Sequence, residues 1–542
     1  MTARLSLSFA PAGRGWRAVA LAVILAAAFA VAGTYFTFSN TYEEPAHIAA
    51  GMQWLAGTHD HDADHPPLAR IAAALGPYLH GDRALGASSP SDEGIRLLGR
   101  GAHYRTTLAL ARMGELPFFL ALCAIAWAWG RRLSDERGGA IAALLVASNP
   151  NLLAHAGLAT TDLALAATVS GALLAFVSWL DAPRWTTALA LGIAAGLAAT
   201  TDYAALAMLA LACPAIYTMR RRASEGPLWT NEPRSRVRLL LGLTAGVAAL
   251  VLWAAYGFRV GPLIDGVPLS FPASAWFRGL ATAATRSSSG RPGYLLGEQS
   301  SSGWWYYYLV ALLVKTPLPL LLLAILGAAA ARRDLVRRAS FEAAALVAGA
   351  GALVLAAAIV GDDTGVRLAL PVFTFLAILG ALAAIELWTQ GASSPPARRL
   401  VRATVVAILG AAMLVPIRTH PDYLAYFNPI AGERPELVLV DSNLDWGQDL
   451  YRLNAVMRRM RIDSVSVAYY GSASLDAAGV RNARPLSAAE RPTGWIAASQ
   501  TMLAGVGGDG AYEWLNELQP VGRVGSSLVL YYIPPPRHVT RR

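Results

Sequence analysis

Apolar residues along this chain come in blocks of roughly 20, separated by short polar segments. A helix of that length crosses a hydrocarbon core of about 30 Å. The pattern therefore predicts a mainly α-helical, polytopic transmembrane bundle of about eleven spans. The expected spans are 18–39, 106–129, 138–156, 160–180, 186–201, 203–219, 238–257, 304–330, 341–360, 367–388 and 402–418.

Arginines in the short polar segments predict the orientation of the bundle. They gather at 131–137, 220–238, 332–338 and 398–402. If the spans alternate in direction, all four clusters fall on one side, which is typical of cytoplasmic loops. The N-terminus then lies inside, and the segments 40–105, 257–303 and 419–542 lie outside.

The N-terminal segment is also consistent with a signal peptide, because Arg4, Arg14 and Arg17 precede the first apolar run. That run is long for the core of a signal peptide, and further spans follow it. We therefore expect an uncleaved first helix.

Two of the outer segments are long enough to hold structure of their own. The first should form helices at 42–55 and 66–79. The last changes to a mixed pattern, with strands expected at 436–440, 464–470 and 526–533 and a helix at 449–461. The sequence thus predicts a membrane module, 1–418, with outer loops 40–105 and 257–303, and a small C-terminal α/β domain, 419–542.

Composition supports the membrane class and excludes others. The chain is 55% hydrophobic and 15% charged, whereas soluble proteins carry about 25% charged residues. The net charge of +10 is placed in the loops between spans, which argues against a nucleic-acid partner. Cys123 and Cys213 both lie in apolar runs, so no disulfide framework is expected.

Candidate chemistry begins just outside the first span. Glu43, His47 and Gly51 fall on one helical face, with Glu44 beside them. A carboxylate paired with a histidine can act as a general base. The structural alternative is that acidic residues simply favour a helix N-terminus.

A second cluster in the same loop contains His59, His61, Asp64 and His65. Imidazole and carboxylate groups at this density can bind a divalent metal ion. A solvated acidic loop explains the same residues, so metal dependence stays open.

Ionisable residues inside predicted spans are functional candidates by default. Asp162 lies near the outer end of the fourth span, where it could also cap the helix. Lys315 is the only lysine among 45 lysine and arginine residues. Its ammonium group could bind a phosphate, or the side chain could simply extend to the membrane–water interface. Arg367 is a second phosphate candidate. Arg112 is a third, although it could instead pair with Glu115.

The tail holds the sequence DSNLDWGQD at 441–449. It is expected between a strand and a helix, a position where α/β sheets commonly bind ligands. Turn and capping roles would explain its aspartates and serine equally well.

Together these segments resemble the C-type, family 39-like glycosyltransferases, the group of the protein O-mannosyltransferases and the lipid A aminoarabinose transferases. The resemblance covers most of the chain, and it depends on the order of many short motifs. The matching segments are EEPAH at 43–47 with Gly51, HPPL at 65–68, NPNLLAH at 149–155, TTD at 160–162, GYLLG at 293–297, GWWYY at 303–307, KTP at 315–317, GVRLALP at 365–371, YLAYFN at 423–428 and DSNLDWGQD at 441–449.

The resemblance implies a polyprenyl-phosphate-linked sugar as donor and a hydroxyl group as acceptor. Glu43 takes the position of the family's catalytic aspartate, and Glu44 that of the acid beside it, so either could be the base. Asp162 matches a second functional acid. Arg291 replaces an expected histidine, and Asp202 stands where related chains often have lysine.

Displacement of the lipid phosphate requires cations as well as a base. Lys315, Arg367 and Arg112 are the expected phosphate ligands, and a single displacement would invert the anomeric carbon. The residues expected to bind substrate or shape the site are His47, His65, Tyr294, Asp441, Asn443, Asp445, Trp446 and Gln448.

Two other functions fit parts of the sequence. A transporter or flippase would also carry charged residues in its spans, but we find no internal repeat. An assembly scaffold would leave those charged residues without a role. Arginine and alanine usage suggests a bacterial inner-membrane protein with a periplasmic tail. The sequence leaves the sugar open, and the acceptor can be a protein, a lipid or a glycan.

Overall fold

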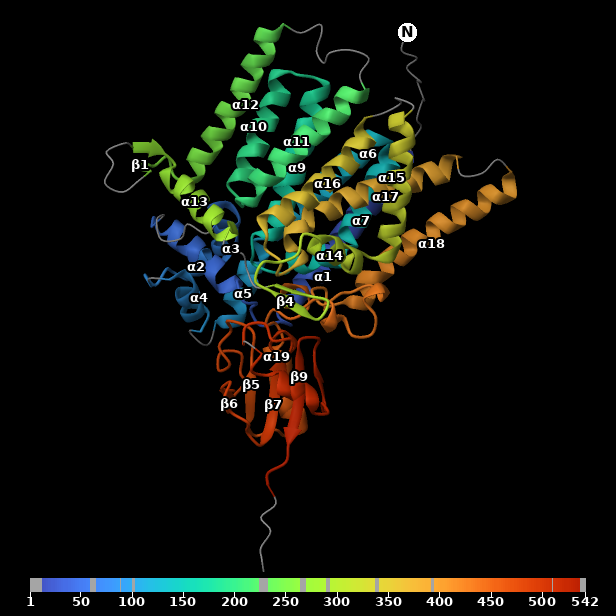
Figure 1. Cartoon of the computed structure of the whole chain (residues 1–542). Helices are drawn as coiled ribbons and strands as arrows, with labels where there is room; N and C mark the ends of the chain where they lie inside the picture. Colours follow the sequence, from blue (N-terminus) through green and yellow to red (C-terminus); the bar gives the residue numbers. More distant parts are fainter. Residues whose placement is uncertain are drawn as a thin grey trace, which may run out of the picture.

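The computed structural model describes residues 12–58, 65–87, 89–99, 103–223, 233–263, 270–288, 293–336, 341–390, 394–508 and 510–536. Its long helices form one bundle, and a small α/β domain built from the C-terminal residues lies at one end of it (Figure 1).

The bundle confirms the predicted mainly helical, polytopic class. Its helices are α1 (Ala12–Thr34), α5 (Tyr104–Met113), α6 (Leu116–Leu133), α7 (Glu136–Ala147), α8 (Pro150–Ala156), α9 (Asp162–Asp181), α10 (Trp185–Ala199), α11 (Ala204–Ala223), α12 (Arg234–Ala255), α14 (Tyr307–Lys315), α15 (Leu318–Val336), α16 (Glu342–Val360), α17 (Leu370–Gln390) and α18 (Pro395–Thr419). A short 3-10 turn, η1 (Val366–Ala369), leads into α17.

The prediction of about eleven spans can be compared with the length and composition of the helices. Within the described ranges, seven helices are long and apolar enough to cross a membrane, or nine if the bent pairs α7–α8 and α14–α15 each form one span. The two remaining predicted spans are helices that fall outside this set. Helix α10 has only 15 residues, and α11 ends in three arginines.

Prolines explain both bends. Helices α7 and α8 meet at 66° beside Pro150, and α14 and α15 meet at 117° beside Pro317. Proline lacks a backbone N–H and disfavours helical geometry in the residue before it. At the first bend, the Asn149 side chain accepts a hydrogen bond of 2.9 Å from the Asn151 N–H and starts the new helix.

Helix α17 lies at the centre of the bundle, with 83% of its apolar window buried, whereas α12 and α18 lie at the periphery. Small residues allow several helices to approach closely. A Cβ atom on Gly327 of α15 would lie 2.0 Å from the Leu379 carbonyl oxygen of α17. This close approach fixes how the two helices pack.

The first of the segments predicted to lie outside the membrane forms α2 (Glu44–Leu55), α3 (Pro67–His80) and α4 (Pro90–Leu98), of which the first two confirm the predicted helices. The second outer segment contains β1 (Val260–Pro262), β2 (Ser270–Pro272), α13 (Ser274–Ser288), β3 (Gly293–Leu295) and β4 (Glu298–Ser300). Helices α2 and α3 pack tightly, because a Cβ atom on Gly51 would lie 2.0 Å from the Arg70 carbonyl oxygen.

The C-terminal residues form the 3-10 turns η2 (Pro429–Ala431), η3 (Pro435–Leu437), η4 (Asp441–Asn443) and η5 (Glu513–Glu517), and the helices α19 (Leu450–Met460) and α20 (Gln500–Leu503). The strands are β5 (Val465–Ala468), β6 (Ala483–Pro485), β7 (Gly494–Ser499), β8 (Gly522–Val524) and β9 (Leu528–Ile533). They form one sheet in the order β6-β5-β7-β9-β8, parallel among the first three and antiparallel at β9 and β8.

The predicted helix 449–461 and the strands 464–470 and 526–533 are confirmed by α19, β5 and β9. The predicted strand 436–440 is wrong, since this segment begins as the 3-10 turn η3. Pro435 starts the turn and has no N–H for a strand ladder. The apolar Leu439 is buried in the core of the bundle instead of the sheet. The sequence did not predict β7, which is the central strand of the sheet.

Backbone hydrogen bonds join the first outer loop to the C-terminal residues. The Ser39 N–H donates to the Gln448 carbonyl, and the Tyr42 N–H donates to the Trp446 carbonyl, each at 3.0 Å. These bonds hold the residues just before Glu43 against the segment 446–448. The predicted domain boundary at residue 418 stays a prediction, since the residues after it contact both the helical bundle and the C-terminal α/β domain.

Candidate functional site

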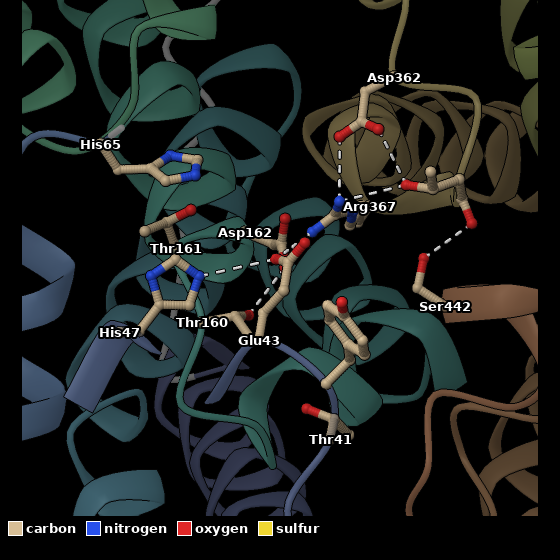
Figure 2. Close-up of polar contacts among 12 residues, drawn as sticks. Thr41, Glu43, His47, His65, Thr160, Thr161, Asp162, Asp362, Arg367 and Ser442 are labelled. Atoms are coloured by element: carbon tan, nitrogen blue, oxygen red, sulfur yellow. Dashed lines mark hydrogen bonds and ion pairs between the residues drawn. The ribbon is translucent and has the colours of Figure 1, made fainter. Parts of the chain in front are cut away.

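A cavity of about 400 Å³ opens beside the start of α2. This size is within the range of about 300–1,000 Å³ that is common for small-molecule sites. The charged and histidine side chains that line it are Glu43, His47, His65, Arg70, Asp162, Asp202, Asp362 and Arg367. They come from segments far apart in the sequence, and Figure 2 shows most of them facing one another.

Glu43 and Arg367 form the central contact of the cavity. A guanidinium nitrogen of Arg367 lies 2.5 Å from Glu43 Oε2. The other terminal nitrogen contacts Asp362 Oδ2 at 3.0 Å and the Thr364 hydroxyl at 3.2 Å. Burial raises the pKa of Glu43, but Arg367 and His47 outweigh it, so the pKa lies well below its usual value. Glu43 is therefore ionised at neutral pH.

His47 lies one turn after Glu43, as the sequence predicts. Its Nε2 is 3.7 Å from Glu43 Oε2, and its Nδ1 accepts a hydrogen bond of 3.3 Å from Arg70 Nε. Since arginine only donates, the proton of the neutral ring lies on Nε2 and faces Glu43. Burial, together with Arg70 and His65, lowers the pKa of His47, so the ring is neutral at pH 7.

Asp162 starts α9 and reaches the same cavity. Its Oδ2 accepts a hydrogen bond of 2.8 Å from the Thr160 hydroxyl and lies 3.3 Å from His155 Nδ1. The side chain is almost fully buried. The structure therefore brings together Glu43, His47, Asp162 and Arg367, as predicted.

His65 and Asp202 form a second histidine–carboxylate pair on the cavity wall. His65 Nδ1 lies 3.0 Å from Asp202 Oδ2, which also accepts from the Thr161 hydroxyl at 3.1 Å. The Ala204 N–H donates to the other oxygen at 2.9 Å. Burial raises the pKa of Asp202, but His65 and the backbone bond lower it below its usual value.

Glu44 points away from the cavity into a buried ion pair. Arg112 donates to its two oxygens from Nε and from a terminal nitrogen, both at 2.8 Å. The N–H groups of Thr41 and Ala159 also donate to it, at 2.8 and 2.9 Å. The partner of Arg112 is thus Glu44 and not Glu115. Neither Glu44 nor Arg112 lines the cavity, so we do not assign them to base or phosphate chemistry.

Lys315 also lies outside the cavity. It is 1% exposed, and its ammonium donates to the carbonyls of Leu424 and Asn443 at 2.8 and 2.7 Å. It lies 4.4 Å from the centre of the Phe427 ring. These contacts hold the end of α14 to the C-terminal residues, which is a structural role.

The predicted tail residues mostly hold loops together. Asp441 accepts a bond of 2.8 Å from the Tyr470 hydroxyl, and Asn443 accepts one of 3.0 Å from the Val366 N–H. Burial raises the pKa of Asp441 to about 7. It does the same for Asp445, which accepts from the Thr501 N–H at 3.0 Å.

Three further tail and loop residues complete this arrangement. Trp446 comes nearest to the cavity, with its ring centre 5.2 Å from the Arg367 guanidinium. Gln448 accepts a bond of 2.8 Å from the Trp446 N–H and so fixes that ring's loop. Tyr294 lines a separate small hollow beside Asp441.

The predicted metal ligands His59, His61 and Asp64 lie outside the described residues, as does Arg291. Within the described ranges, no group of three or more His, Cys, Asp or Glu side chains could hold a metal ion. His65 is described, and its Nδ1 is engaged by Asp202.

Sequence reasoning missed three residues around the cavity. Arg70 orients His47, Asp362 binds Arg367, and His155 lies beside Asp162. His155 belongs to the motif at 149–155, and Arg70 and Asp362 lie within three residues of the motifs at 65–68 and 365–371. Their polarity in otherwise apolar surroundings was the available signal. Asp362 and His155 lie only five and seven residues before their partners Arg367 and Asp162, whereas Arg70 lies 23 residues after His47.

Comparison with known proteins supports the predicted resemblance. Residues 110–230 match the sequence model of the family described as dolichyl-phosphate-mannose-protein mannosyltransferase. This stretch contains Asp162 and Asp202, and it confirms the resemblance over that part of the chain. A search of the curated proteins gave no match.

Solved structures of two kinds are similar to this chain. With the apo oligosaccharyltransferase of Archaeoglobus fulgidus the TM-score is 0.45 and the identity 15%, over 73% of this chain and 55% of that chain. With ArnT from Cupriavidus metallidurans bound to undecaprenyl phosphate the TM-score is 0.49 and the identity 14%, over 96% of this chain and 99% of that chain. The chain thus spans about half the length of the archaeal enzyme.

Proposed function

We propose that this protein is a membrane glycosyltransferase that moves a sugar from a polyprenyl-phosphate carrier to a hydroxyl acceptor on the outer membrane face. The observation that carries the proposal is the contact between Glu43 and Arg367 in the cavity. It places an ionised carboxylate next to a fixed cation, the two groups that such a transfer needs. The partial family match supports the same reaction class.

Arg367 is the residue best placed to receive the donor phosphate. A guanidinium binds phosphate with two parallel hydrogen bonds. Its buried Nε has no hydrogen-bond partner among the described residues, so one N–H is free to donate. Phosphate oxygens would compete with Glu43 for the terminal nitrogen, and the carboxylate would be released as the donor binds.

Glu43 then serves as the base. As Arg367 turns to the phosphate, the pKa of Glu43 rises toward its usual value, which makes the carboxylate a better proton acceptor. The acceptor oxygen attacks the anomeric carbon, its proton passes to Glu43, and the bond to the phosphate oxygen breaks. The electron pair leaves with the polyprenyl phosphate, whose charge Arg367 stabilises. One displacement inverts the anomeric configuration.

The surroundings of Glu43 support this role. The Nε2–H of His47 and the Arg367 guanidinium both face its Oε2 atom, so the other carboxylate oxygen is available to the acceptor. Asp162 adds a second carboxylate to the same wall, where it favours positive charge developing on the sugar. We propose a bacterial inner membrane as the location, with the α/β domain in the periplasm. The acceptor is a protein, lipid or glycan hydroxyl.

The test is release of polyprenyl phosphate from radiolabelled lipid-linked sugars by the purified protein, with membrane extract as the source of acceptor. We compare the wild type with Glu43→Gln and Arg367→Gln. The matched control is Glu433→Gln, because Glu433 is an exposed glutamate outside the cavity. Loss of the base should lower the rate by about 10²–10⁴-fold, and loss of the cation by about 10²–10³-fold.

Donor binding separates the two roles. Glu43→Gln should still bind the donor, whereas Arg367→Gln should bind it more weakly. Equal activity of Glu43→Gln and the wild type would remove Glu43 from the mechanism. If the wild type releases polyprenyl phosphate from none of the donors, even with divalent metal present, the proposed transferase activity is refuted.

A further inference from the structure

The pair formed by His65 and Asp202 has a defined hydrogen-bonding direction. An ionised carboxylate only accepts, so the contact of 3.0 Å requires the proton of His65 to be on Nδ1. Asp202 is itself fixed by the Thr161 hydroxyl and the Ala204 N–H. In the neutral form of the ring, Nε2 therefore carries a lone pair.

That lone pair is available to a ligand. No residue in the described part of the chain forms a hydrogen bond with His65 Nε2. The side chain is 30% exposed and lines the cavity. Figure 2 shows the His65 ring extending over Thr161, on the same side as His47 and Glu43. The ring centres of His47 and His65 are 5.3 Å apart, and His47 Nε2 in turn lies 3.7 Å from Glu43 Oε2.

The charge of the cavity restricts what can bind there. Its described lining contains four carboxylates, on Glu43, Asp162, Asp202 and Asp362, and two guanidiniums, on Arg70 and Arg367. Arg367 is needed for the phosphate. The other charged side chains that line the cavity have a net negative charge, so a carboxylate on the sugar would be repelled. Hydroxyl groups, which donate hydrogen bonds without charge, suit an acceptor such as Nε2.

We propose that His65, oriented by Asp202, determines donor specificity by accepting a hydrogen bond from one hydroxyl group of a sugar that carries no carboxylate. The inference rests on the proposed function and adds the recognition of the sugar to it. Asp202 is a positioning residue in this account, because it acts only through His65.

A site that recognises a hydroxyl group through one hydrogen bond rejects a sugar that lacks this hydroxyl. The bound sugar then buries the polar atom of the site without a hydrogen-bond partner. The wild type should therefore lose at least about 10-fold in kcat/KM when that single hydroxyl is removed from the donor. Removal of the other hydroxyls should cost less. A uronic acid donor of the same stereochemistry should be a poor substrate.

The experiment uses undecaprenyl phosphate linked to glucose, mannose or galactose, together with the singly deoxygenated and uronic acid forms of whichever sugar is transferred. Each measurement is made with and without EDTA. We compare the wild type with His65→Leu, which removes the acceptor, and His65→Gln, which keeps an acceptor oxygen. The matched control is His80→Leu, because His80 is an exposed histidine of the same outer segment that does not line the cavity.

The expected result is a loss of discrimination at one ring position. The ratio of kcat/KM for the parent and deoxy donors should fall to about 1 in His65→Leu, recover in part in His65→Gln, and stay unchanged in His80→Leu. A merely structural role would lower the activity toward both donors and leave the ratio intact. That outcome would overturn the inference.

Other outcomes are equally decisive. Absence of discrimination by the wild type against every deoxy donor would refute the inference even if the His65 variants fail to fold. Loss of wild-type activity in EDTA, with recovery on adding metal in the wild type but not in His65→Leu, would assign Nε2 to a metal ion instead. In both cases the transferase itself would stand. No release of polyprenyl phosphate by the wild type with or without EDTA would refute the proposed function, and this inference with it.

Discussion

Replacing Glu44 by glutamine tests which of two adjacent glutamates is the base. Glu44 and Arg112 are both completely buried. Their two contacts of 2.8 Å form a bidentate ion pair, and two backbone N–H groups complete the shell of the carboxylate. Burial raises the pKa of Glu44, but Arg112 and these bonds lower it below its usual value. We therefore expect the change to act on folding.

The magnitude follows from the burial of both charges. Removing one partner of a buried pair leaves the other charge uncompensated and costs about 3–5 kcal/mol. This corresponds to a change of about 10²- to 4 × 10³-fold in the folding equilibrium, since 1.4 kcal/mol is a factor of ten. Replacing both partners by apolar side chains of similar size, as in Glu44→Leu with Arg112→Met, should recover most of the loss.

The assay is the midpoint of denaturation in mixed micelles for the wild type, the two single variants and the double variant. The single variants should unfold at lower denaturant, and the cycle should give a large favourable coupling between the two positions. Glu43→Gln, one residue earlier, should destabilise the protein less than Glu44→Gln, because Glu43 is partly exposed and Arg367 keeps its contact with Asp362. A Glu44→Gln protein with normal stability and no transferase activity would refute this reasoning and make Glu44 the base.

Three further predictions concern the supporting structure. Lys315→Met should destabilise the protein by about 2–4 kcal/mol, because two buried carbonyls lose an ammonium donor; denaturation would measure it, and a raised KM for the donor without loss of stability would contradict it. Asp441→Asn should flatten the pH dependence of thermal stability between pH 4 and 7. The raised pKa of about 7 means that stability present below pH 4 is lost as pH rises, by on the order of a few kcal/mol. Gly51→Ala should separate α2 from α3 and cost about 1–3 kcal/mol, with reduced transferase activity; a normal melting curve would show that the helices can adjust.

The sequence was informative about residues at the outer ends of predicted spans. Glu43, Asp162 and Arg367 each adjoin an apolar block whose length fixes their depth. Side chains at the same depth in a helical bundle can line the same cavity, and these three do so. The limit was rotation about the helix axis. Adjacent residues point about 100° apart, so Glu43 enters the cavity while Glu44 faces Arg112.

Long-range partners set the other limit. Lys315 is unusual by composition, but its ligands are carbonyls 109 and 128 residues later in the chain. No local pattern distinguishes such a position from one that faces a cavity. The segment 436–440 has the apolar residues of a strand, yet Leu439 belongs to the core of the bundle. The apolar residues of this segment correctly indicated burial. Whether they are buried in the sheet or in the helical bundle depends on the tertiary structure.

The bend between α14 and α15 has a consequence for the synthesis of this protein. The Asn428 amide donates to the carbonyls of Leu313 and Thr316, and Lys315 is held by residues 424 and 443. A ribosome adds about 5–20 residues per second, so the bent helix waits roughly 6–22 s for Asn428, which lies 112 residues after Thr316. During that time its free carbonyls must be satisfied by water, lipid head groups or an insertion chaperone. Nascent chains that end before residue 428 should therefore be targets for membrane quality control, although most of the predicted spans have already been made.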